Sequence, residues 1–272
     1  MNEAWQRRFR PPAQWRLDGR APVVLCCNDD GIGAFGLELL SSIASHLAIT
    51  WVVAPDREQS TTSHALTLGK RLRAERVGER KFQVVEGTPT DCALLALRGI
   101  LPEKPDLVLS GVNHGSNMGE DVLYSGTVAA AMEATILGCP AVAFSFAGDD
   151  DDVMASWEST LRTLLRSLLR RWVWPSETFL NINLPGTRSG GVEDVAMTSL
   201  GRRDYEGSVN RESDPTIHDE IMFRIGGVSA NWRGSDDADF RALDAGKVSV
   251  TPLQLDLTHS RVASEPTWSL NV

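Results

Sequence analysis

Cysteine motifs, long apolar runs and excess positive charge are all missing from this sequence of 272 residues. The four cysteines (Cys26, Cys27, Cys92 and Cys139) have no CxxC spacing, and two of them lie in apolar segments typical of strands. We therefore expect buried free thiols and a reducing, cytoplasmic location. No apolar run approaches the roughly 18 residues that a membrane span needs. The net charge of −9 disfavours binding to duplex nucleic acid, which requires a basic face.

The composition is that of a globular protein, with 42% hydrophobic and 23% charged residues. Residues 1–20 contain several arginines and no apolar stretch, so we interpret them as an N-terminal extension rather than a secretory signal. Residues 21–260 are long enough to form a single domain. Gly, Asp and Arg dominate residues 201–220, which predicts an arm outside the core at about 200–235, and residues 261–272 form a tail.

Apolar periodicity predicts an α/β fold. A buried strand at Val23–Cys27 is followed by a helical pattern at 37–47 and a second apolar strand at 49–54, which together make a βαβ unit and start a parallel sheet. Further strands are expected at 64–72, 81–85, 107–109, 141–146, 179–184 and 248–253, and further helices at 88–100, 128–137 and 154–172.

Two adjacent carboxylates, Asp29 and Asp30, follow the first strand within the sequence Asn28-Asp29-Asp30-Gly31. Open α/β sheets bind ligands at the carboxyl ends of their strands. Two negative charges so close together repel each other, and a divalent cation between them relieves the repulsion. The alternative interpretation is a solvated acidic turn. The apolar surroundings favour a metal site, with Mg²⁺ or Mn²⁺ as the hard cation.

Two more strand ends supply matching chemistry. Ser60 follows the strand at 49–54 and Asn113 follows the strand at 107–109, and both offer neutral oxygen atoms to a cation. Ser125 and Thr127 open the alanine-rich helix, where hydroxyls and free amides form an anion pocket. Each residue has a structural alternative: the hydroxyls suit a helix cap and the asparagine suits a turn. His64 and His114 likewise suit hydrogen-bonded loop positions.

The segment Gly31-Ile32-Gly33-Ala34-Phe35-Gly36 matches the GxGxxG fingerprint of NAD(P)-binding folds, with Asp56 about 20 residues further on. In that fingerprint a pyrophosphate lies beside the first glycines. Here Asp29 and Asp30 precede them, so carboxylates would face phosphates unless a cation lay between. An NAD(P)-dependent enzyme is therefore the weaker alternative, and bound nicotinamide or flavin absorbance would favour it.

The ordered motifs of this chain resemble the SurE family of 5'/3'-nucleotidases over residues 22–257. The motifs are NDDG at 28–31, VAPDR at 53–57 with Ser60 and His64, GTPTDC at 87–92, SGVN at 110–113, DVLYSGT at 121–127, NINLP at 181–185 and VSVTPL at 248–253. Two positions depart from the family pattern: GAFG at 33–36 replaces a common HAPG, and His114 follows SGVN.

The resemblance implies a Rossmann-like, three-layer α/β/α fold with an extended C-terminal arm that is exchanged in homodimers or homotetramers. It implies metal-dependent hydrolysis of nucleoside monophosphates, with one ion per subunit. The metal ligands it implies are Asp29, Asp30, Ser60 and Asn113, and its phosphate-binding residues are Asn117, Ser125, Gly126 and Thr127.

For such a reaction we expect Asp29 and Asp30 to hold the ion, with Asp29 also orienting or deprotonating the attacking water. His64 is the predicted proton donor to the leaving alkoxide. The rival from another class is a non-catalytic sensor that binds a nucleotide and a metal. It would release no phosphate from nucleoside monophosphates with any divalent metal.

Overall fold

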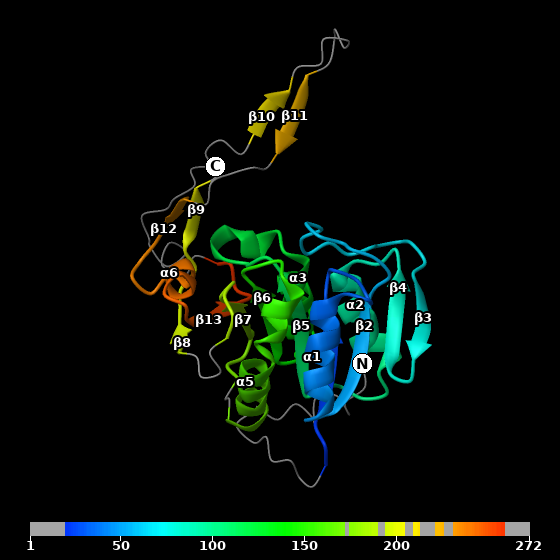
Figure 1. Cartoon of the computed structure of the whole chain (residues 1–272). Coiled ribbons are helices and arrows are strands. Elements are labelled where there is room, and N and C mark those ends of the chain that lie inside the picture. The colour runs from blue at the N-terminus through cyan, green and yellow to red at the C-terminus, as the bar shows by residue number, and fades with distance from the viewer. Residues whose placement is uncertain are drawn as a thin grey trace, which may run out of the picture.

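The structure, a computed structural model, describes residues 20–171, 174–189, 194–204, 209–212, 221–225 and 231–258 (Figure 1). The predicted N-terminal extension lies outside the described residues except for Arg20, and so does the tail at 261–272. The strands are β1 Val23–Cys27, β2 Ile49–Pro55, β3 Arg73–Gly78, β4 Lys81–Val85, β5 Leu107–His114, β6 Ala141–Phe146, β7 Thr178–Leu184, β8 Val195–Met197, β9 Arg202–Asp204, β10 Val209–Glu212, β11 Met222–Ile225, β12 Asn231–Arg233 and β13 Val248–Gln254. The helices are α1 Phe35–Ser45, α2 Pro89–Leu95, η2 Ala96–Ile100, η3 Gly119–Leu123, α3 Gly126–Ile136, α4 Asp151–Ala155, α5 Glu158–Arg171 and α6 Asp239–Asp244.

A central sheet has the strand order β3-β4-β2-β1-β5-β6-β7-β13-β8. The six strands from β4 to β7 in this order run parallel, while β3 and β13 run antiparallel to their neighbours β4 and β7. The chain builds outward from β1 to β2 and β4, then returns to the other side of β1 with β5. The carboxyl ends of β1 and β5 are therefore the switch point at which doubly wound sheets bind ligands.

Helices cover both faces of this sheet (Figure 1). One apolar cluster joins α1, α4 and α5 to the sheet, and Leu40, Trp157 and Phe144 are among its buried members. The opposite cluster joins α2 and α3 to the other sheet face, with Cys92 and Val128 among its members. The predicted three-layer α/β/α architecture is confirmed, because successive strand residues point alternately into the two clusters.

The strand predicted at 64–72 is wrong, and the strand in this region is β3, which begins at Arg73. Leu66 and Leu68 of the predicted strand are exposed, Leu68 by 80%, and only Leu72, next to β3, packs against the core. The start of α2 holds this segment instead: the Thr67 N–H donates to Asp91 Oδ1 at 2.9 Å, and the Thr88 hydroxyl donates to the Ala65 carbonyl at 2.7 Å. Thr88 is the N-cap of α2, and Asp91 completes a capping box.

Two other element boundaries also differ from the prediction. Residues 110–114 were expected in a loop, but β5 continues to His114 because Asn113 and His114 pair with β6 beyond an irregularity in register. The single helix expected at 154–172 is two helices, α4 and α5. Asp150 caps α4 by accepting a hydrogen bond from the Val153 N–H at 3.0 Å.

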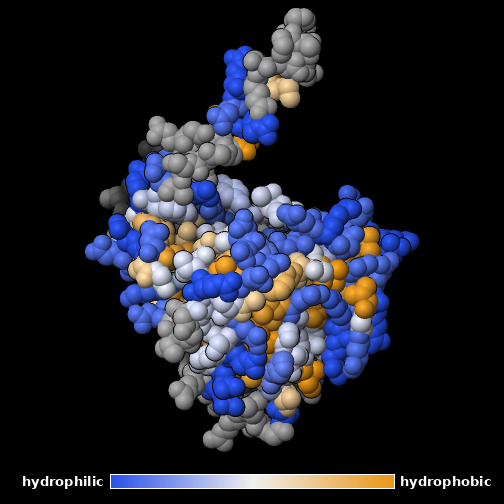
Figure 2. Space-filling view, in the orientation of Figure 1, coloured by the Kyte–Doolittle hydropathy of each residue, from blue (hydrophilic) through white to orange (hydrophobic). Residues whose placement is uncertain are grey.

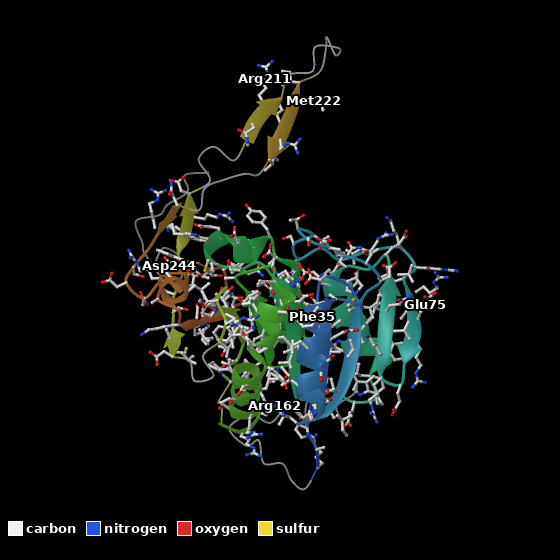
Figure 3. All side chains as sticks on the ribbon, viewed as in Figure 1. Phe35, Glu75, Arg162, Arg211, Met222 and Asp244 are labelled. Carbon is white, nitrogen blue, oxygen red and sulfur yellow. The ribbon has the colours of Figure 1, made fainter. Side chains whose placement is uncertain are left out.

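The arm predicted at about 200–235 corresponds in its described part to β9, β12 and the hairpin of β10 and β11, which projects from the body (Figure 1). Figure 3 shows Arg211 and Met222 on this hairpin, away from the sheet. Its side chains include exposed apolar ones: Phe223 is 58% exposed and Ile225 is 82% exposed. Figure 2 shows a few hydrophobic residues among the mostly hydrophilic ones of the hairpin.

All four cysteines are buried and free, as the sequence predicts. Burial raises the thiol pKa of Cys27 and of Cys139 to about 12, and that of Cys26 and Cys92 well above its ordinary value. Within the described ranges, no helix combines the length and the apolar character needed to cross a membrane.

Candidate active site

The loop after β1 is held in place by its own backbone and by the end of β2. The Asn28 side-chain amide donates to the Gly31 carbonyl at 2.9 Å, which closes a turn around the two aspartates. The Ile32 N–H donates to the Pro55 carbonyl at 2.8 Å, and the Gln59 N–H donates to the Asp29 carbonyl at 2.7 Å. The aspartate pair therefore occupies a fixed position at the switch point of the sheet.

Asp29 lies directly against the start of α3. Its side chain is buried, and its Oδ1 atom accepts a hydrogen bond from the Thr127 hydroxyl. A Cβ atom at Gly126 would lie only 2.8 Å from Asp29 Cβ and 2.9 Å from its Oδ2 atom, so only glycine permits this approach. Burial raises the pKa of Asp29, while the Thr127 hydrogen bond lowers it. The predicted metal site and the predicted phosphate site are thus in contact.

Asp30 is the more solvent-accessible carboxylate of the pair, and its surroundings disfavour its negatively charged form. Burial and then the negative charge of Asp29 raise its pKa to about 6, partly offset by His114, while Glu58 raises it further. The Asp30 Oδ2 atom is buried and has no hydrogen-bond partner among the described residues. A buried carboxylate oxygen in this state favours a bound cation.

Neutral oxygen atoms complete the donor set. Both amide hydrogens of Asn113 are used, in bonds to the carbonyls of His114 at 2.8 Å and Gly115 at 2.9 Å, so its side-chain oxygen is the atom left to bind a ligand. The Ser60 hydroxyl donates to Glu58 Oε1 at 2.8 Å. No three His, Cys, Asp or Glu side chains gather as a metal cluster in the part of the chain that the structure describes. Two carboxylates supplemented by neutral oxygens fit a hard divalent cation.

The start of α3 has the features of an anion site. Ser125 is its N-cap, with Oγ accepting a hydrogen bond from the Val128 N–H at 3.1 Å, so the cap interpretation of Ser125 is confirmed. The N–H groups of Gly126 and Thr127 fall in the first turn and have no acceptor within the helix, and the Thr127 N–H faces the Asp29 carboxylate. The Gly126 amide and the helix dipole favour an anion there.

Asn117 anchors the loop after β5 to neighbouring strands. Its N–H donates to Asn183 Oδ1 at 2.9 Å, and its side-chain nitrogen donates to the Ser145 hydroxyl at 2.8 Å. Its carbonyl accepts hydrogen bonds from the side chains of Asn181 and Asn183. The side-chain nitrogen of Asn117 is therefore already bonded within the protein, and its predicted contact with phosphate stays a prediction.

The two histidines lie in different surroundings. His64 Nε2 is 3.0 Å from Oε2 of Glu133, a buried residue further along α3, so its predicted role as proton donor stays a prediction. His114 Nε2 is 2.9 Å from Asp151 Oδ1, and the charge of this histidine acts on Asp30. Sequence reasoning assigned no site role to His114 or to Glu58. Their positions next to Asn113 and near Ser60 are the signals that could have found them.

The pKa of Asp30 predicts a pH effect on the metal-free protein. Its folded value of about 6 lies above the unfolded value of roughly 3.9. The folded state therefore takes up a proton first as the pH falls, so this group adds stability at acidic pH that is lost as the pH rises through about 6.

We expect the Asp30→Asn variant to be more stable than the unmodified protein at pH 7.5 in the presence of a chelator, and to lose most of this advantage by pH 4.5. Urea unfolding of both proteins across this pH range measures the difference in unfolding free energy. The charges of Asp29, Glu58 and His114 contribute to it because they shift the pKa of Asp30. A difference in unfolding free energy that does not change with pH would contradict the assignment.

Comparison with known proteins identifies the family. Residues 24–207 match the family model described as survival protein SurE. The chain belongs to the SurE family. It is 51% identical over 247 residues to the 5'-nucleotidase SurE of Gemmatimonas aurantiaca, covering 90% of this chain and 97% of that protein. The 5'-nucleotidase SurE of Geotalea daltonii is 42% identical, with 91% of this chain and 99% of that protein covered.

The fold is shared as well. The crystal structure of the SurE protein from Aquifex aeolicus matches with a TM-score of 0.80 and 38% identity, covering 89% of this chain and 96% of that one. Packing geometry accounts for the last glycine of the GxGxxG segment in this SurE-family chain. Gly33 is exposed, and a Cβ atom added there would have no neighbour within 4 Å, whereas a Cβ atom at Gly36 would lie 1.9 Å from the Val112 carbonyl oxygen. The last glycine therefore serves the packing of α1 on β5.

Proposed function

We propose that this SurE-family protein is a 5'-nucleotidase, a hydrolase that converts nucleoside monophosphates to nucleoside and inorganic phosphate with a divalent metal. The main support for the proposal is the contact between Asp29 and the start of α3. This contact brings the proposed cation site next to the proposed anion site at the carboxyl ends of the strands. Relatives named 5'-nucleotidase SurE, at 51% and 42% identity, support it. Action on 3'-monophosphates is part of the proposal.

Asp29, Asp30, Ser60 and Asn113 would hold one Mg²⁺ or Mn²⁺ ion per subunit. When bound, the ion polarises a phosphoryl oxygen and lowers the pKa of bound water. Asp29 would direct the attacking water with its second oxygen; its burial and the hydrogen bond from the Thr127 hydroxyl support this role.

Phosphate oxygens would be bound at the start of α3. The N–H of Gly126 would donate to them, whereas the Thr127 N–H faces the Asp29 carboxylate instead. The Ser125 hydroxyl hydrogen is a further donor because its oxygen is the acceptor in the helix cap. Fixed donors of this kind stabilise the negative charge that develops on phosphoryl oxygens in the transition state.

A panel of metals and substrates tests the function. Purified protein is incubated with 5'- and 3'-nucleoside monophosphates in Mg²⁺, Mn²⁺ or Ca²⁺, and released phosphate is measured. We expect release with Mg²⁺ or Mn²⁺, and none after chelation until metal is restored. Nucleotide binding without release of phosphate in any metal would refute hydrolysis in favour of a nucleotide sensor.

We further propose a homodimer or homotetramer that forms through the arm at about 200–235. A hairpin of two strands is marginal in water when it stands alone, and Phe223 and Ile225 expose apolar surface on it that a second copy of the chain would cover. We also propose a cytoplasmic location, which the four buried free thiols support.

A further inference from the structure

The helix η3 determines where the phosphate site lies. It occupies Gly119–Leu123, between Asn117 and Ser125. The Asp121 carbonyl accepts hydrogen bonds from the Tyr124 N–H at 3.0 Å and from the Ser125 N–H at 3.2 Å. Because Ser125 caps α3, a movement of η3 would move the cap and the first turn of α3.

A buried carboxylate outside the parallel sheet holds the beginning of η3. Asp239, the first residue of α6, is fully buried. Its Oδ2 atom accepts the Gly119 N–H at 2.9 Å, while its Oδ1 atom accepts the Gly201 N–H at 2.9 Å and the Phe240 N–H at 2.8 Å. One side chain thus joins η3, the segment entering β9, and α6. Figure 1 shows α6 beside β9 and β12, at the root of the projecting hairpin.

Arg203 of β9 makes a second connection to η3. Its guanidinium donates to Asp121 Oδ2 at 2.6 Å, and its backbone N–H donates to Glu120 Oε2 at 2.8 Å. The guanidinium also lies 5.6 Å from the ring centroid of Trp232, which stacks on Phe240. The root of the arm and α6 therefore form one packed support behind η3.

The residues at the start of η3 pack closely against this support. A Cβ atom at Gly119 would lie 2.8 Å from the Gly201 carbonyl oxygen and 2.9 Å from the ring of Trp232. Met118 also packs into the small apolar cluster of Ala238 and Phe240. The support therefore fixes the position of η3 rather than merely touching it.

We propose that Asp239, together with Arg203, is a positioning residue for the phosphate site, acting through η3 on Ser125 without touching the substrate. The inference rests on the proposed function and adds to it a support outside the parallel sheet. A carboxylate suits the role because its two oxygens accept from three N–H groups on opposite sides. An asparagine would turn an NH₂ group toward one of those sides, where donor would face donor.

The Asp239→Asn variant tests the proposal. We expect KM for a nucleoside 5'-monophosphate and the inhibition constant of orthophosphate to rise tenfold or more. We expect the Mn²⁺ concentration that half-saturates the thermal shift to stay within twofold, because Asp29 and Asp30 are held by β1 and β2. Amide exchange across 119–126 should also become faster. The Arg203→Gln variant should raise the same two constants by a smaller factor.

The matched control is Asp106→Asn, which lies at the amino ends of the central strands β1 and β5, opposite the proposed site. Asp106 also accepts a backbone hydrogen bond, from the Val23 N–H at 2.8 Å, and pairs with Arg20. It should lower the melting temperature without changing KM or the inhibition constant.

Unchanged constants in Asp239→Asn, or equal changes in Asp106→Asn, would overturn the inference. If Asp239→Asn fails to fold, KM and the inhibition constant of orthophosphate in Arg203→Gln test the inference instead. Absence of turnover in the unmodified protein would refute the proposed function but not the role of Asp239. The affinity of each variant for orthophosphate in Mn²⁺, measured by calorimetry, would still test that role.

Discussion

Replacing Asp29 with asparagine is expected to lower metal-dependent release of phosphate about 10³-fold or more, with the fold intact. The substitution removes one of the two carboxylate charges proposed to attract the cation, a loss of about 4 kcal/mol in transition-state stabilisation. The Thr127 hydroxyl still finds an acceptor in the asparagine oxygen, so the contact with α3 is kept. Without metal, the variant should be the more stable protein, since burial disfavours the charged form of Asp29.

Phosphate release and the thermal shift produced by Mn²⁺ are measured together on this variant. Asp149→Asn is the matched control because it makes the same change in charge at an exposed position after β6, near the same edge of the sheet. It should leave both measurements unchanged. If Asp29→Asn kept full turnover, or showed the Mn²⁺ shift of the unmodified protein, Asp29 would not be a metal ligand.

Replacing Gly36 with alanine should destabilise the protein by about 3 kcal/mol or more, although alanine is normally favoured over glycine in a helix. The added Cβ atom would lie 1.9 Å from the Val112 carbonyl oxygen and 2.9 Å from its carbonyl carbon. Either α1 or β5 must move, and β5 carries the Asn113 proposed to bind metal next to its last residue. The melting temperature should fall by roughly 6–12 °C.

Gly33→Ala provides the comparison three residues earlier. No atom lies within 4 Å of a Cβ atom at this position, and the residue is exposed. Its unfolding free energy in urea should stay within about 0.5 kcal/mol of the unmodified protein. Equal effects at the two positions would mean that the close approach of α1 and β5 is not what requires glycine at residue 36.

The central sheet and the aspartate pair could be predicted because their signals are local. Five consecutive apolar residues, Val23–Cys27, indicate a strand buried on both faces, and the carboxylates follow it directly. Parallel strands bring their carboxyl ends to one edge, so the proximity of Asp29 to Thr127 follows from topology once the strands are recognised. The family motifs then indicated which loops contribute the predicted metal-binding and phosphate-binding residues.

Other features depend on contacts between distant segments that no local pattern carries. The segment at 64–72 alternates like a strand, yet its backbone is bonded to the beginning of α2. His64 pairs with Glu133, 69 residues away, while His114 acts on Asp30. Asp239 reaches Gly119 across 120 residues, and nothing in the residues around it indicates a role at the phosphate site.

The buried thiols have a practical consequence for anyone handling the molecule. With pKa values of about 12 for Cys27 and Cys139, and raised values for the other two, almost no thiolate exists near neutral pH. Alkylating reagents and mild oxidants attack the thiolate, so the native chain should tolerate storage in air without a reducing agent. The rate at which a maleimide dye labels the protein would then report how often its interior opens.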